Sequence, residues 1–186
     1  MKFEILLDRP SSATLKVLFW VFLALTLSFS LFIFGPIMAQ FPPKAGLMDI
    51  KNAWSKENMD AIISIWKADS SQDYVALMKM LNAWDFAFMA IYGVALFSGL
   101  LNTTRRFAQG SKIQRIYLNA SLFLPILAVG TDFLEGIFIA IMLNDVNNIS
   151  QASAIGASLS TFLCMIFLYS GVFMILIGFL ATARKQ

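Results

Sequence analysis

Long runs of apolar residues, separated by shorter polar segments, dominate the chain. Four of these runs contain no basic residue and have about 20 residues or more, the length a helix needs to cross a hydrocarbon core of about 30 Å. They cover residues 17–38, 83–102, 116–143 and 154–183. None alternates apolar and polar positions as barrel strands do, and only helices and closed barrels satisfy the backbone in lipid. The pattern therefore predicts an all-α integral membrane protein, a four-helix bundle forming a single transmembrane domain over residues 1–186.

The connection between the first two runs, residues 40–82, is the longest polar segment and has a helical pattern of its own. Ser55, followed by polar residues, is typical of a helix start, and apolar side chains then recur at helical spacing. These side chains are Met59, Ile62, Ile63 and Trp66. A second helix start is expected at Ser70, with Asp73 in the capping-box position. We expect a helical cap on the outer side of the bundle, either a membrane-surface anchor or a lid over a pocket.

The composition agrees with a lipid environment and excludes several kinds of chemistry. Apolar residues make up 59% of the chain and charged residues 13%, whereas an average soluble domain has about 25% charged residues. Mean hydropathy is +0.73. Histidine is absent and Cys164 is the single cysteine, which excludes an internal disulfide, a His-ligated haem, a Cys/His zinc site and a His-based triad. No cofactor motif is present, so we expect no cofactor.

Basic residues gather on one side of the predicted bundle. The N-terminal flank, the connection between the second and third runs, and the C-terminus together hold nine Lys and Arg residues. The connection between the third and fourth runs has none, and the five lysines of the first connection are offset by five acids. By the positive-inside rule we expect a multi-pass protein of the plasma membrane, the inner membrane of a bacterium, with both termini cytoplasmic. The basic edge then contacts anionic lipid of the bilayer, and no nucleic-acid partner is expected.

Three acids, Asp85, Asp132 and Glu135, lie within the predicted spans, where ionisable side chains are costly and usually face the bundle interior. Asp132 and Glu135 are three residues apart and share a helix face, whereas Asn82 and Tyr92 share the face of Asp85 on the second span. These five residues are the candidate ligand-binding residues, all expected in one outward-facing acidic pocket. We assign none of them to catalysis or to a metal.

The three carboxylates need protons or positive charge nearby, because like charges repel strongly in a low dielectric. No Lys, Arg or His lies within the four predicted spans. One interpretation is a structural network in which one or two carboxyls are protonated. Another is that a proton, a metal ion, a cationic ligand or a partner subunit supplies the charge. A third is that Lys79, six residues before Asp85, reaches down from the membrane interface.

Short motifs in the second and third spans resemble a family of small bacterial four-span membrane proteins. The motifs are Trp84-Asp85 through Tyr92-Gly93, then Arg105-Arg106, then Asp132-Phe133-Leu134-Glu135, over about 60 residues. The family pattern is D…Y-G in the second span and D-x-x-E-N in the third, and Gly136 stands here in place of the final Asn. The resemblance draws attention to the acids and to Tyr92 but implies no reaction. The layout is also loosely similar to the sterol-isomerase and sigma-2-receptor superfamily, which has four spans, cytoplasmic ends and a long first outer loop.

The favoured hypothesis is a membrane protein without enzymatic activity, whose acidic pocket binds a small ligand, a cation or a proton. One alternative is a structural accessory subunit that contacts other membrane subunits, or a second copy, through Phe-rich and small-residue faces. Another is a membrane enzyme acting on a lipophilic substrate, with Asp132 or Glu135 as general acid/base and Tyr92 assisting. The lack of histidine, of a phosphate-binding loop and of a cofactor fingerprint weighs against the enzyme.

Overall fold

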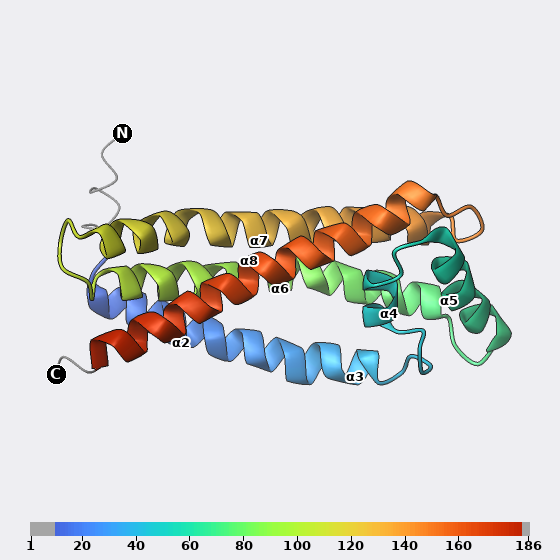
Figure 1. The fold of residues 1–186 in the computed structure, drawn as a ribbon. Helices are drawn as coiled ribbons and strands as arrows, with labels where there is room; N and C mark the ends of the chain where they lie inside the picture. The colour runs from blue at the N-terminus through green and yellow to red at the C-terminus, as the bar shows by residue number, and fades with distance from the viewer. Residues whose placement is uncertain (1–9, 184–186) are drawn as a thin grey trace. The chain divides into compact units, whose positions relative to one another are not determined.

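A computed structural model describes residues 10–183 of the chain, and over this range the protein is helical with no strand (Figure 1). The helices are α2 (Ser12–Phe29), the π-helix η1 (Ser30–Phe34), α3 (Gly35–Met38), α4 (Leu47–Lys51), α5 (Lys56–Ala68), α6 (Tyr74–Thr104), α7 (Lys112–Asn144) and α8 (Gln151–Ala183). Four helical segments are long and apolar enough to cross a membrane, namely Ser12–Met38, Tyr74–Thr104, Lys112–Asn144 and Gln151–Ala181. The predicted all-α fold with four spans is therefore confirmed, and the chain is an integral membrane protein.

The chain divides into two compact units, and residues of each long helix belong to both. The first unit consists of Met1–Thr26, Ala90–Val129 and Met165–Gln186, and the second consists of Leu27–Met89 and Gly130–Cys164. The single transmembrane domain over the whole chain stays a prediction.

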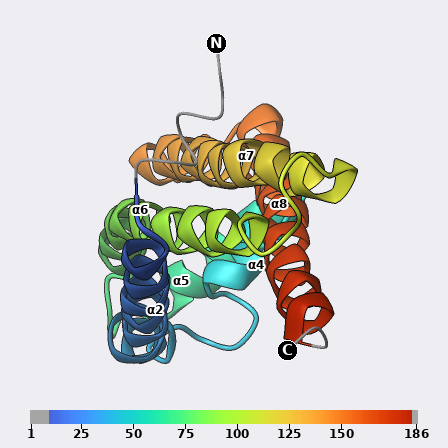
Figure 2. The same ribbon diagram turned by 90° about the vertical axis from the view of Figure 1, so that its left-hand side faces the viewer.

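In the first unit, a short turn over residues 105–111 joins α6 to α7 (Figure 2). Gly99 of α6 allows a close helix contact, because a Cβ atom at this position would lie 2.7 Å from Ile175 Cδ1 of α8. Small residues allow such close approach between membrane helices. The Tyr117 hydroxyl of α7 donates a hydrogen bond to the Met174 carbonyl at 2.9 Å, which fixes α7 against α8.

The second unit contains a hydrophobic core that joins the helices to the segment between α3 and α6, residues 39–73, which we call the cap. The cap contributes the apolar face of α5, and all four side chains predicted for that face are buried. Ser55 begins the helix as predicted, because its hydroxyl accepts the Asn58 N–H at 3.2 Å. The core also includes Tyr74, Leu77, Met78 and Leu81 of α6, Ile139, Met142 and Leu143 of α7, and Ala154 and Ala157 of α8.

The predicted start of the next helix at Ser70 is wrong by one turn. Helix α6 begins at Tyr74, and the Asp73 carboxylate accepts the Ala76 N–H at 2.9 Å, so Asp73 is itself the N-cap. The preceding turn is organised by Asp69 instead. Hydrogen bonds from Ser71 and Tyr74 hold the pKa of Asp69 at about 2, below its ordinary value.

Candidate functional site

The three acids of the predicted spans lie together inside the second unit. Helix α6 carries Asp85, and one face of α7 carries Asp132 and Glu135. Carboxylate oxygens from all three residues lie within 4.8 Å of one another, and at least 94% of the surface of each residue is buried. Residues far apart in the sequence thus form one buried acidic cluster.

The positive charge in this cluster comes from Lys51, at the end of α4 in the cap. Its Nζ atom lies 3.1 Å from Asp85 Oδ2 and 2.6 Å from Glu135 Oε1. The Asp85 contact is a hydrogen-bonded ion pair, and the shorter Glu135 contact is a second ion pair. Lys79 does not supply the charge, since its side chain is exposed and lines a different cavity.

Helix α4 was not predicted, although its sequence explains why Lys51 is buried. The Gly46 N–H donates to the Asp49 carboxylate at 2.9 Å, which caps the first turn of α4. Leu47, Ile50 and Lys51 then lie at helical spacing on one buried face. A lysine on the apolar face of a short capped helix was the available sequence signal for this residue.

The charges around Lys51 keep it protonated. Burial lowers the pKa of the Lys51 ammonium, but the negative charges of Asp85, Glu135 and Asp132 raise it by more. The pKa of Lys51 therefore stands above its ordinary value of 10.5. At neutral pH Lys51 contributes a full positive charge to the cluster.

Helix α8 completes the surroundings of the cluster through Thr161. The Thr161 hydroxyl donates to Glu135 Oε2 at 2.6 Å, and both residues are buried. This bond orients one oxygen of Glu135 toward α8 and leaves Oε1 for Lys51. Sequence reasoning missed Thr161, because a single threonine in an apolar helix usually bonds its own backbone.

The other two candidate residues are uncharged, and they belong to different units, Asn82 to the second and Tyr92 to the first. Asn82 is buried and donates from Nδ2 to the Gly136 carbonyl of α7 at 3.1 Å, so it links α6 to α7. Tyr92 is buried within the first unit. The ligand-binding roles of all five candidate residues stay predictions.

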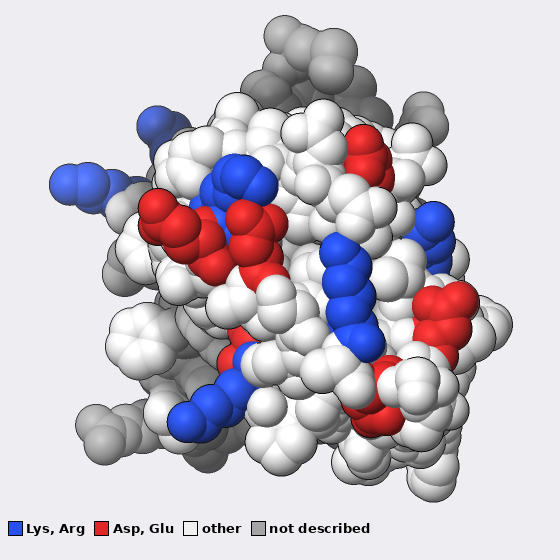
Figure 3. Space-filling view, turned by 90° about the vertical axis from the view of Figure 1, so that its right-hand side faces the viewer, with Lys and Arg blue, Asp and Glu red and all other residues white. Residues whose placement is uncertain are grey.

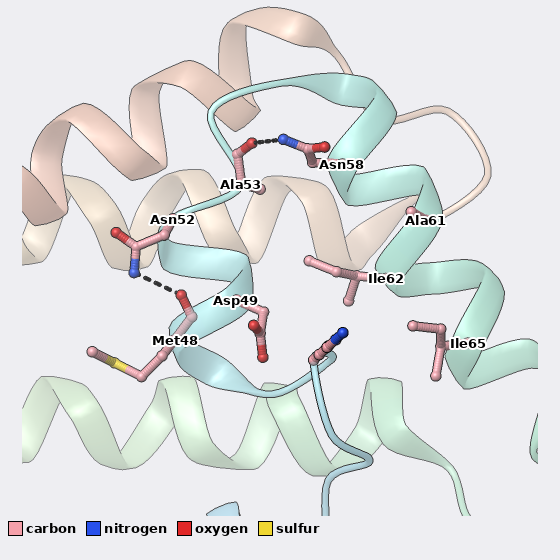
Figure 4. A pocket seen from close by; sticks show the side chains of 9 residues that line it. Met48, Asp49, Asn52, Ala53, Asn58, Ala61, Ile62 and Ile65 are labelled. Carbon is pink, nitrogen blue, oxygen red and sulfur yellow. Dashed lines mark hydrogen bonds between the residues drawn. The ribbon is translucent and has the colours of Figure 1, made fainter.

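The cap also contains a cavity of about 540 Å³ between α4 and α5 (Figure 4). The side chains of Ile62 and Ile65 face α4 across it. Two amides in its wall are engaged with the cap backbone, since Asn58 Nδ2 donates to the Ala53 carbonyl at 2.6 Å and Asn52 Nδ2 donates to the Met48 carbonyl at 2.7 Å. These bonds give the cap its shape. The charged residues that line the cavity, Lys44 and Asp49, have opposite signs, unlike the excess of acids in the buried cluster.

The face of the molecule drawn in Figure 3 has basic and acidic side chains next to each other. The second unit as a whole has five lysines and nine acids. Three of those nine acids are in the buried cluster, where they meet one lysine. The excess of negative charge in this unit is thus partly internal.

Comparison with known proteins does not extend this description. No protein-family model matches the chain, and neither the curated proteins nor the solved structures contain a match. The resemblance drawn from the sequence motifs therefore stays a prediction.

Proposed function

We propose that the protein binds a small cation at the buried cluster of Lys51, Asp85, Asp132 and Glu135. The observation that supports this function is the charge of the cluster. Three carboxylates and one ammonium meet there, which gives a formal charge of −2 when all four groups are ionised. A buried site with a net formal charge is costly. One divalent metal ion, or two protons, would bring the cluster to neutrality.

The arrangement of oxygens supports a metal ion such as Mg²⁺, Mn²⁺ or Ca²⁺. These hard cations prefer carboxylate oxygens and commonly complete their coordination with water. Oxygens within 4.8 Å of one another can face a single ion without a large movement of α6 or α7. Thr161 holds one oxygen of Glu135 and so limits its rotation.

A cation would reach the cluster by displacing α4, which carries Lys51. This helix lies between two residues with left-handed backbone, Lys44 with φ of 66° and Trp54 with φ of 56°. Such conformations cost about 1–3 kcal/mol for residues other than glycine and persist only where the surroundings impose them. The Trp54 N–H is held by the Ser158 hydroxyl of α8 at 3.0 Å. With the predicted membrane orientation, the cap and this entry route face outward.

Thermal unfolding of the purified, chelator-treated protein tests the proposal. The unfolding temperature is measured with and without about 1 mM MgCl₂, CaCl₂ or MnCl₂ at constant ionic strength. A ligand that binds only the folded state stabilises it more as the ligand concentration rises above the dissociation constant. We expect at least one divalent salt to raise the unfolding temperature of the wild type and of Asp145→Asn, which changes an exposed acid outside the cluster. Asp132→Asn should abolish the increase.

If the increase is the same in Asp132→Asn as in the wild type, the cluster is not the cation site. If no divalent salt acts on the wild type, the same variants are compared between pH 5 and 8. A stability change with pH that disappears in Asp132→Asn supports protons as the cations. If the stability of the wild type and of Asp132→Asn depends on pH in the same way, the cluster binds neither metal ions nor protons and the proposal is wrong.

A further inference from the structure

A second cavity lies between α6 and α7 in the second unit, apart from the charges of the cluster. Its volume is about 420 Å³. It is lined by Lys79, Asn82, Ala83 and Phe86 of α6 and by Ala140, Leu143 and Asn144 of α7. Ala83 and Ala140 are exposed, so the cavity is a groove open along the surface of two membrane-spanning helices. Lipid is the solvent that such a surface meets.

Asn82 gives this groove a polar feature that the helix packing does not use. Its Nδ2 atom donates to the Gly136 carbonyl, and this bond fixes which way the amide faces. The Oδ1 atom then has no hydrogen-bond partner in the structure, and 95% of the surface of Asn82 is buried. A buried acceptor without a donor is rare in native proteins and calls for a partner. A donor for Asn82 Oδ1, which lies beside Gly136 and near the Phe86 ring, has to come from a water molecule or from a ligand in the groove.

Lys79 lies one helical turn closer to the start of α6 than Asn82. Its side chain is exposed, and no ion pair involving it occurs within residues 10–183. Phe86 lies one turn beyond Asn82 in the other direction. Along the groove, a cation is thus followed by a hydrogen-bond acceptor and then by apolar side chains, each about one turn or 5 Å from the next.

We propose that this groove binds a lysophospholipid, a lipid with a phosphate, a free glycerol hydroxyl and a single acyl chain. The phosphate pairs with Lys79, the hydroxyl donates to Asn82 Oδ1, and the chain lies along Ala83, Phe86 and Ala140. A diacyl phospholipid has an ester in place of that hydroxyl and, where its headgroup has no donor, cannot donate to Asn82. To admit the hydroxyl the ring of Phe86 must turn, which is feasible because it packs edge-on against Phe133, a side chain that is itself half exposed.

The groove does not depend on the proposed cation site, and its test uses different residues. The protein is placed in phosphatidylcholine nanodiscs that contain equal amounts of lysophosphatidylmethanol and diacyl phosphatidylmethanol with the same chain length, because this anionic headgroup has no hydroxyl of its own. Native mass spectrometry of the released protein then measures the ratio of the two lipids retained. We expect the lysolipid to be enriched about tenfold over the diacyl lipid, the effect of one hydrogen bond that includes a buried acceptor.

Three variants assign the enrichment to the groove. Ala83→Leu fills the groove from an exposed position and should reduce the retained lysolipid about tenfold, whereas Ala87→Leu, one turn away at another exposed position, should leave it unchanged. Lys79→Gln should reduce retention of both anionic lipids. Equal retention of the two lipids by the wild type would overturn the proposal. Lysolipid retention by Ala83→Leu equal to that of the wild type would also overturn it. Binding of soluble glycerophosphate with the same affinity as the lysolipid would also overturn it, because the chain would then contribute nothing.

Discussion

Lys51 and Asp85 are 34 positions apart in the chain, yet Lys51 Nζ lies 3.1 Å from Asp85 Oδ2 with both side chains about nine-tenths buried. This ion pair connects a five-residue helix of the cap directly to α6. The cap is therefore part of the acidic cluster, since it provides an ammonium that pairs with Asp85 and Glu135.

Removing the Lys51 ammonium should destabilise the protein strongly. Lys51→Met keeps most of the side-chain volume but leaves Asp85 and Glu135 buried without their cation, and such losses typically cost about 3–5 kcal/mol. Lys67→Met is the control, because Lys67 is exposed and donates to Asn147, also an exposed residue, at 2.7 Å. We expect that control to change the unfolding free energy by less than about 1 kcal/mol. Equal losses in the two variants, measured by denaturant unfolding in detergent, would mean that the buried ion pair contributes no more than a surface contact.

The contribution of Lys51 should not change between pH 7 and 10. Its pKa in the folded protein is above the ordinary 10.5, so its stabilisation is complete below 10.5 and is lost only as the pH rises through the higher folded value. The stability difference between the wild type and Lys51→Met should thus be constant over that pH range. In the wild type, an amine-reactive reagent at pH 9 should modify the exposed Lys44 and Lys79 and leave Lys51 unmodified. Peptide mass spectrometry measures the extent at each lysine, and modification of Lys51 at the rate of Lys79 would contradict its burial as an ammonium.

The contact between α7 and α8 in the second unit can be tested with two glycines. An Ala side chain at Gly156 would place its Cβ 2.7 Å from the Phe138 ring, whereas nothing lies within 4 Å of a Cβ at Gly130. Gly156→Ala should therefore cost about 1–3 kcal/mol through overpacking. Gly130→Ala should be neutral or stabilise by up to about 1 kcal/mol, because alanine is the better helix former. The reverse order of the two unfolding temperatures would show that α7 and α8 do not pack in this way.

The distribution of basic residues predicts the direction of the chain in the membrane, and this direction can be measured in intact cells. In a Cys164→Ala background, a cysteine replacing the exposed Asn148 should react with a membrane-impermeant thiol reagent. A cysteine replacing the exposed Gln109, between α6 and α7, should react only after permeabilisation. Labelling of the Gln109→Cys variant alone in intact cells would reverse the predicted orientation.

The four spans could be predicted from the sequence because lipid imposes a strong constraint on composition. A run of about 20 mostly apolar residues without Lys or Arg has few alternatives to a membrane helix, and the ends of these runs agree with the helices to within about three turns. The apolar face of α5 could be predicted for a related reason, since four apolar residues recur at helical spacing after the N-cap Ser55.

The partner of the acids could not be predicted in the same way. Charge balance showed that Asp85, Asp132 and Glu135 need a positive group, but sequence distance favoured Lys79 over Lys51. Lys51 reaches the cluster only because the cap folds back onto α6, and that tertiary arrangement depends on contacts such as the Trp66 Nε1–H donating to the Ala45 carbonyl at 2.7 Å. Helical periodicity describes faces of single helices and carries no information about which loop lies over them.

Binding of Mn²⁺ at the cluster can be measured by electron paramagnetic resonance, because the free ion has a strong signal that weakens when the ion is bound. Purified wild-type protein is titrated with MnCl₂, and Asp132→Asn, Asp145→Asn and Lys51→Met are titrated under the same conditions. We expect the wild type and Asp145→Asn to bind one Mn²⁺ per chain at a saturable site, and Asp132→Asn to lose that site. Lys51→Met should bind Mn²⁺ at least as tightly as the wild type, because the competing ammonium is absent. Titrations of Asp132→Asn and Asp145→Asn that cannot be distinguished from that of the wild type would contradict a cation site at this cluster.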